Sequence, residues 1–118
     1  MRVQSCKAKG RRLQQEVCKK LVDISNGLTP DDIRSTSMGA PGEDIQMSSA
    51  ARQQFPWSIE CKNVEKLSIW SAIEQARENK KNDEVPVVMF KKNHEETHVA
   101  MPLEYFLKIF QDSMDKQK

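Results

Sequence analysis

Trp-Ser-Ile-Glu-Cys-Lys-Asn, residues 57–63, is the stretch that decides the expected fold. Side chains alternate between the two faces of a β-strand, so Glu60 and Lys62 share one face while Ile59 and Cys61 share the other. This alternation predicts a strand with one face packed on the core and one face turned to a charged cleft. The segment therefore brings an acid and a base together on the same side of a sheet.

A second acid opens the short run 44–47, which we also expect to be a strand. Alternation turns Ile45 and Met47 towards the core and Asp44 to the opposite face. If this strand pairs antiparallel with the strand that carries Glu60, the two carboxylates can meet. The intervening segment 48–56 is too long for a tight hairpin, and we expect a mobile flap there.

The spacing of apolar residues predicts the remaining elements. They are a helix at 9–24 that ends before Asn26-Gly27, a loop at 28–41, a helix from 64 or 66 to 80, strands at 85–90 and 97–101, and a last helix opened by Pro102. The middle helix is expected to bury Ile69, Trp70, Ile73 and Ala76. These elements predict an α/β fold in which helices pack against a mixed central sheet of about four strands.

Length and composition predict one folded domain over residues 1–118. Charged residues make up 31% of the chain and hydrophobic residues 37%, which is typical of a globular protein rather than a disordered one. There is neither an apolar run long enough for a membrane span nor the apolar core of a signal peptide. The three cysteines, widely spaced, predict reduced thiols rather than disulfides. We therefore expect a cytoplasmic protein that does not interact with membranes.

Positive charge gathers at the N-terminus, although the formal net charge is only +2. Up to residue 20 the bases are Arg2, Lys7, Lys9, Arg11, Arg12, Lys19 and Lys20, against the single acid Glu16. A basic arm at 1–9 that continues into a helix could contact phosphates. A solvated terminus explains the same charge equally well.

The two acids and the lysine suit phosphodiester hydrolysis. Magnesium prefers oxygen ligands and keeps several of its waters, so Asp44, Glu60 and the backbone carbonyl of Cys61 would suffice to hold Mg²⁺ or Mn²⁺. Lys62 could orient the attacking water, help to deprotonate it, or offset the charge of the phosphate. Alone, a Glu-x-Lys sequence on a strand usually indicates a solvated ion pair rather than a catalytic site. The preceding strand with Asp44 and the following helix together favour the metal site.

These residues resemble the core of the PD-(D/E)XK nuclease superfamily, which includes phage and archaeal Holliday junction resolvases. The resemblance runs from roughly residue 16 to residue 88 and implies a restriction-endonuclease-like core. It also implies that Glu16 on the first helix completes the metal site and that Gln75 on the later helix supports it. Glu43 stands where the family usually has proline, and alternation places it on the other face of the strand, which favours Asp44 as the ligand.

The resemblance implies a Mg²⁺- or Mn²⁺-dependent DNA endonuclease of phage or bacterial DNA processing, with Holliday junction resolution as one possibility. Arg11, Arg12 and Arg52 are the expected phosphate contacts. One such domain covers a single scissile phosphate, so a homodimer is expected if both strands of a duplex or a junction are cut. The alternative is a noncatalytic DNA- or protein-binding module built on the same fold.

Overall fold

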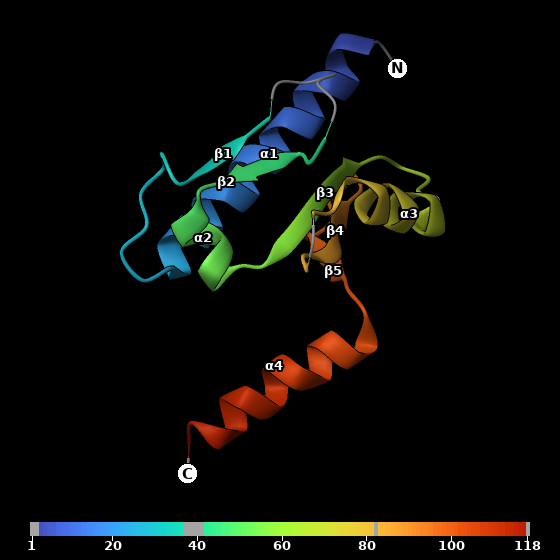
Figure 1. Ribbon diagram of the computed structural model, residues 1–118. Helices are drawn as coiled ribbons and strands as arrows, with labels where there is room; N and C mark the ends of the chain where they lie inside the picture. The colour runs from blue at the N-terminus through green and yellow to red at the C-terminus, as the bar shows by residue number, and fades with distance from the viewer. Residues whose placement is uncertain (1–2, 37–41, 82, 118) are drawn as a thin grey trace.

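The computed structural model describes residues 3–36, 42–81 and 83–117. In chain order the elements are α1 (Val3–Ile24), β1 (Ile33–Ser35), β2 (Ile45–Met47), α2 (Ser49–Gln54), β3 (Trp57–Asn63), α3 (Ile69–Asn79), β4 (Val85–Lys91), β5 (His98–Ala100) and α4 (Leu103–Asp115). Strands β1 and β2 pair antiparallel in a small sheet, while β3, β4 and β5 form a second sheet (Figure 1). The protein is thus a mixed α/β fold.

Strand β4 lies at the centre of the second sheet, parallel to β3 and antiparallel to β5. Its consecutive residues Val87 and Val88 point to opposite faces, and both are buried. Val87 belongs to the core under α1, and Val88 belongs to a smaller core under α3. The prediction that this strand is covered on both faces is therefore confirmed.

The face of β3 expected to be apolar does pack on the main core. Ile59 and Cys61 are buried together with Leu13, Val17 and other apolar residues of α1. The opposite face turns towards α3, where Ser58 donates a hydrogen bond to the carbonyl of Ala76. Helices α1 and α3 thus sandwich the strand that carries Glu60 and Lys62.

Two expectations about the sheet and the N-terminus are wrong. A single sheet of about four strands was expected, but β1 forms in the segment predicted as a loop and pairs with β2 in a separate sheet. Helix α1 already begins at Val3, so most of the expected arm at 1–9 is helical. Residues 1–2 of that arm and residues 37–41 of the expected loop lie outside the described residues.

The segment 48–56, expected as a flap, contains the short helix α2. Ser48 caps this helix by accepting a hydrogen bond from the backbone N–H of Ala51, the interaction that favours serine at this position. Ala51 and Phe55 are both buried in the main core. Apolar anchors in the helix and at its C-terminal end therefore fix α2 against the rest of the protein.

Helix α3 contacts the sheet through small residues. Ala72 and Ala76, one turn apart, are buried against Val88, and Trp70 points away from them with 73% of its surface exposed. The expectation that Trp70 is buried is wrong. The helix approaches the sheet closely through its two alanines, and Trp70 lies on the other side of the helix.

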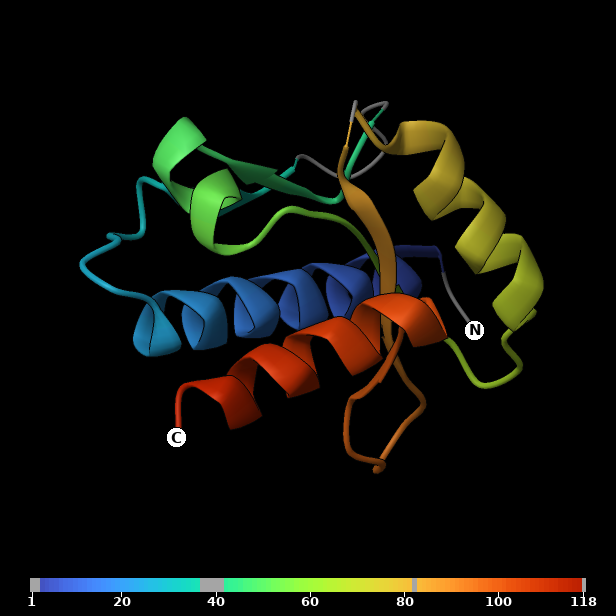
Figure 2. The same cartoon turned by 60° about the horizontal axis from the view of Figure 1, so that its bottom comes forward.

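Helix α4 begins after Pro102 as expected but does not pack on the sheet (Figures 1 and 2). None of residues 103–115, all of them described, is buried. Both faces of β4 are already covered, one by the core under α1 and the other by the core under α3. Among the described residues, no helix has the length and apolar character required to cross a bilayer.

Candidate active site

Asp44 lies just before β2 and is held against the edge of β3. Its backbone N–H donates to the carbonyl of Ile59 at 3.3 Å, and its carboxylate Oδ2 accepts the backbone N–H of Cys61 at 2.7 Å. These two bonds attach Asp44 to β3 without a regular ladder, since β2 pairs with β1. The antiparallel pairing that could have brought the two acids together does not form, yet Asp44 still reaches Glu60.

Glu60 is the centre of the cluster, and only 5% of its surface is exposed. Its carboxyl group is in hydrogen-bond contact with that of Asp44. Asn79, at the end of α3, donates from Nδ2 to Glu60 Oε1 at 2.9 Å, and Lys62 Nζ lies 4.0 Å from Glu60 Oε2. One strand, one helix and the segment before β2 thus bring two acids, a lysine and an amide together.

Negative charge in this cluster is poorly compensated. Burial raises the pKa of Asp44, while burial and then the charge of Asp44 raise the pKa of Glu60 to about 7. The hydrogen bond from Asn79 and the charge of Lys62 act in the opposite direction on Glu60 but are the smaller effects. The two carboxyl groups therefore retain a proton up to near-neutral pH, and a divalent cation could replace it.

The edge of β3 also presents a backbone oxygen to this cluster. The carbonyl of Ile59 accepts from Asp44, so the carbonyl of Cys61, two residues further along the strand, points out of the same edge. Within the described residues there is no group of three or more His, Cys, Asp and Glu side chains suited to a metal. A cation here would have two carboxylates, one carbonyl and several waters as ligands, a set that suits Mg²⁺.

The cysteine beside these acids is not a nucleophile. Burial, and then the charge of Asp44, raise the pKa of the Cys61 thiol far above its ordinary value. The protonated thiol is unreactive, because the thiolate is the attacking species. Only the backbone of Cys61 can take part in the chemistry of the site.

Glu43, the neighbour of Asp44, belongs to a different interaction. It is buried and lies 3.5 Å from Arg52, which also pairs with Glu84. Burial raises the pKa of Glu43, and the charges of Arg52 and Lys81 offset this. Because Arg52 is held between two acids, the expectation that it contacts phosphate is not supported by its position.

Replacing Arg52 should mainly destabilise the fold. Arg52→Met leaves Glu43 and Glu84 without their shared cation, and we expect a loss of about 3 kcal/mol of unfolding free energy, measured by urea denaturation. Arg77→Met, which breaks only the exposed pair with Glu74, should cost less than about 0.5 kcal/mol. An Arg52 variant of unchanged stability but weakened DNA binding would instead restore the predicted phosphate contact.

Glu16 lies away from Asp44 and Glu60. It pairs with Lys20 on the next turn of α1, at 3.5 Å, and lines a groove with Met89 and Val99 of β4 and β5. This groove is on the α1 face of the sheet, whereas Glu60 faces α3. The role assigned to Glu16 by the family resemblance is therefore not supported by its position.

The amide that contacts Glu60 is Asn79 rather than Gln75, which is exposed on α3. The two residues are one turn apart, so the helix was predicted but the turn that meets Glu60 was not. On α1 the buried polar side chain is Gln14, whose Oε1 has no hydrogen-bond partner among the described residues. Glu16 was the residue of α1 expected to act in the site, and Gln14 was not predicted.

Comparison of the chain with protein-family models, curated proteins and solved structures finds no match. A function can therefore be proposed only from the geometry of the site and the sequence pattern.

Exposed bases lie on two parts of the molecule. Arg11 and Arg12 are exposed on α1. Arg34 and Lys81 are also exposed, and together with Arg52 and the acids Asp31 and Asp32 they line a polar groove of about 330 Å³ beside α2. Because Lys81 is close enough to influence Glu43, the neighbour of Asp44, this groove is near the candidate site.

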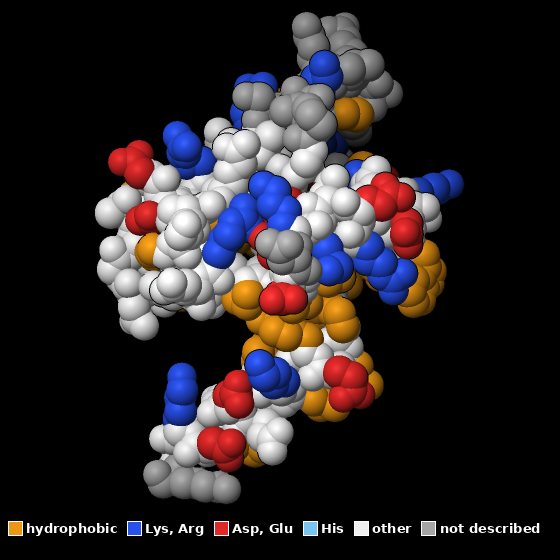
Figure 3. Space-filling view, viewed as in Figure 1, with side chains coloured by type: hydrophobic (Ala, Val, Ile, Leu, Met, Phe, Trp, Pro, Cys, Tyr) orange, Lys and Arg blue, Asp and Glu red, His pale blue; other side chains and the backbone are white. Residues whose placement is uncertain are grey.

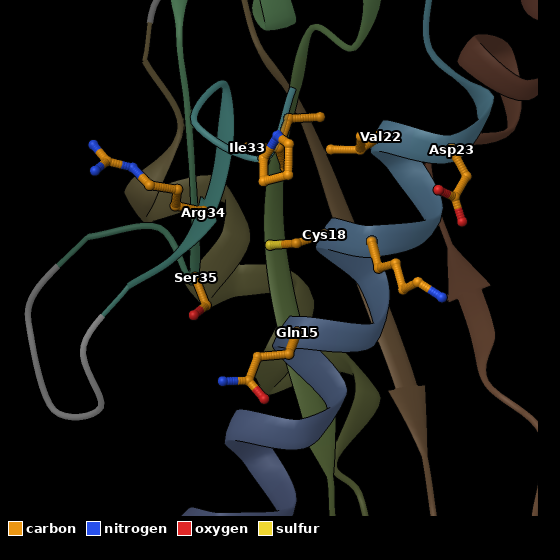
Figure 4. A pocket seen from close by; sticks show the side chains of 9 residues that line it. Gln15, Cys18, Val22, Asp23, Ile33, Arg34 and Ser35 are labelled. Atoms are coloured by element: carbon orange, nitrogen blue, oxygen red, sulfur yellow. The ribbon is translucent and has the colours of Figure 1, made fainter. Parts of the chain in front are cut away.

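A separate cavity of about 570 Å³ lies between α1 and β1. Figure 4 shows Cys18 and Val22 of α1 directed towards Ile33, and the lining is largely apolar. Burial raises the pKa of Cys18 to about 11, so this thiol is protonated at neutral pH. Asp44, Glu60 and Lys62 do not line this cavity, so it has no part in the candidate active site.

Proposed function

We propose that this chain is a Mg²⁺- or Mn²⁺-dependent endonuclease that hydrolyses DNA phosphodiesters, with a core like that of the restriction endonucleases. The observation that carries the proposal is the contact between the half-buried carboxyl group of Asp44 and the buried one of Glu60, with Lys62 4.0 Å from the latter. Holding two acids in contact away from water is unfavourable unless a proton or a cation offsets their charge. Perturbed acids with a nearby lysine are typical of catalytic sites.

Each residue of the cluster has a distinct task in this hydrolysis. Asp44 and Glu60 hold the cation, which when bound offsets charge on the nonbridging oxygens and lowers the pKa of water. Lys62 orients the attacking water and stabilises the charge that builds up on the phosphate. The water oxygen bonds to phosphorus, the bond to the leaving oxygen breaks, and that oxygen takes up a proton. Asn79 fixes the orientation of Glu60 through its hydrogen bond.

DNA is the proposed substrate because of the family resemblance and the exposed bases. Arg11 and Arg12 on α1, with Arg34 and Lys81 near the site, offer positive charge to a phosphate backbone. A role in phage or bacterial DNA processing in the cytoplasm, with four-way junctions among the substrates, belongs to the same proposal.

A noncatalytic nucleic-acid- or protein-binding module is the second candidate. It is favoured by the position of Glu16 and by the lack of a third acidic ligand among the described residues near Asp44 and Glu60. On this alternative Asp44 and Glu60 are structural, and the exposed bases alone contact the partner.

DNA cleavage by the purified chain separates the two candidates. Linear duplex, single-stranded and four-way DNA are incubated with Mn²⁺ or Mg²⁺, and a matched series contains EDTA. We expect cleavage products only in the samples without EDTA, in which the metal ion is free to bind the protein. DNA that is bound in a salt-sensitive manner but left intact with either metal would reject the nuclease and favour the binding module.

A further inference from the structure

Helix α4 is amphipathic, but within the described part of the chain its apolar face is not buried. Its apolar residues recur at i, i+3, i+4, i+7 and i+11, so they form one continuous stripe along the helix. The stripe consists of Leu103, Phe106, Leu107, Phe110 and Met114, all of which are exposed. An apolar stripe that faces water is unfavourable for an isolated domain and indicates a surface that another molecule covers.

The other side of α4 holds the helix to the domain. Tyr105 lies on this side and accepts a hydrogen bond from the indole N–H of Trp57. Because Tyr105 is about 140 to 200° around the helix from Leu103 and Phe110, this contact turns the stripe away from the body. The exposure of the stripe therefore follows from how α4 is anchored.

The stripe continues onto the body of the protein. A groove of about 270 Å³ between α3 and the start of α4 is lined by Trp70, Ile73, Met101 and Leu103. Figure 3 shows hydrophobic side chains gathered where α4 meets the body. Trp70 is 73% exposed and Leu103 66% exposed, so the apolar surface spans two elements.

The size of this surface fits a specific protein interface. With aromatic side chains at about 150–250 Å² each, the exposed stripe and Trp70 present on the order of 600 Å² of apolar surface. With a polar rim, this approaches the roughly 800 Å² that each partner contributes to a standard interface. The apolar surface is thus at the upper end of the roughly 300–600 Å² that the largest patch of a typical monomer covers, and such patches are often functional.

The charges that flank the stripe favour a second copy over a membrane or a nucleic acid. Within the described residues, α4 and its cap carry the acids Glu104, Asp112 and Asp115 and the bases Lys108 and Lys116. A helix that binds anionic lipid or phosphate needs an excess of bases, which this one lacks. Charges of both signs beside the stripe allow an acid of one copy to face a base of the other.

We propose that a second copy of this chain covers the α4 stripe, with the two α4 helices packed antiparallel about a twofold axis and Phe110 near that axis. Such an interface is isologous, because each copy contributes the same surface. Trp70 and the groove beside Leu103 extend the contact on both sides. The proposal does not depend on the nuclease activity.

Sedimentation of the full chain without DNA or metal tests this proposal. We expect wild-type protein to sediment at twice the 13.6 kDa mass of one chain and the Phe110→Glu variant at that single mass. Because Phe110 is exposed in one copy, the variant should keep its helical circular dichroism signal. Gln111→Glu adds the same charge at the next residue, outside the stripe, and should remain dimeric.

A milder variant guards against misfolding. Leu107→Gln adds no charge and should weaken the dimer at least about tenfold, since it removes roughly 1.4 kcal/mol or more of apolar contact. Wild-type protein that is monomeric throughout the micromolar range, or a Phe110→Glu variant that stays dimeric, overturns the proposal. Monomers that sediment with anionic vesicles would assign the stripe to a membrane surface instead.

Discussion

Glu60→Gln is expected to lower metal-dependent DNA cleavage by at least about 10³-fold while making the metal-free protein more stable at pH 8. Activity falls because glutamine supplies no negative charge to hold the cation against Asp44. Stability rises because the same substitution removes the charge of a buried acid that contacts a second, half-buried acid. A gain in stability with a loss of activity is typical of a residue retained for function.

The pH dependence of unfolding follows from the direction of the shift. The pKa of Glu60 rises from 4.5 to about 7 on folding, so between these values the folded state holds more protons than the unfolded state. The unfolding free energy of the metal-free protein therefore falls as pH rises through this window. The Glu60→Gln variant lacks this contribution, and at pH 8 it should be more stable than the wild type by about 1–3 kcal/mol.

Thermal unfolding at pH 5 and pH 8, with and without Mg²⁺, measures these effects beside a cleavage assay. Mg²⁺ should raise the melting temperature of the wild type at pH 8 and leave the Glu60→Gln variant unchanged. Glu78→Gln, which neutralises an exposed acid on α3, should behave as wild type in every measurement. Cleavage that persists in the Glu60→Gln variant would refute the assigned mechanism.

Lys62→Met is expected to reduce cleavage by about 10²- to 10³-fold and to leave metal binding intact. The ammonium group is assigned to the water and the phosphate, so its loss slows the reaction without removing a ligand. Its positive charge also lowers the pKa of both acids, and without it Asp44 and Glu60 bind their proton more tightly. The cleavage rate and the Mg²⁺-induced rise in melting temperature, measured together, separate these two effects.

Lys66→Met, which removes an exposed lysine beyond the end of β3, is the control and should cleave normally. If the Lys62→Met variant loses the Mg²⁺-induced stabilisation as well as activity, then Lys62 acts by keeping Asp44 and Glu60 ionised for the cation rather than in the reaction. Full activity of the variant would remove Lys62 from the proposed mechanism.

Local periodicity determined much of the fold. Alternation predicted which face of the 57–63 strand enters the core, since neighbouring side chains in a strand must point in opposite directions. The apolar spacing and Gly27, whose φ of 76° suits the end of a helix, correctly predicted where α1 ends. These signals concern the chain within a few residues, and they are readable without the rest of the fold.

The candidate site was only partly predictable. The sequence indicated Asp44, Glu60 and Lys62, and the structure brings these residues together. The route by which they meet was not predictable, because Asp44 is attached to β3 by its own backbone and side chain rather than through a strand ladder. Asn79 was not predicted either, since its contact with Glu60 depends on how Ala72 and Ala76 of α3 pack against the sheet.

The sequence by itself thus determined the order of most elements, the sides of β2 and β3 that face the core, and the acids and lysine of the candidate site. Only the tertiary structure decided that β1 and β2 form a separate sheet, that Glu16 faces away from Glu60, and that α4 remains uncovered. The physical reason is that an apolar stripe predicts that a face will be buried but does not specify the surface that will cover it. Here α1 and α3 occupy the two faces of β3 and β4, and α4 contacts the body instead through the hydrogen bond from Trp57 to Tyr105.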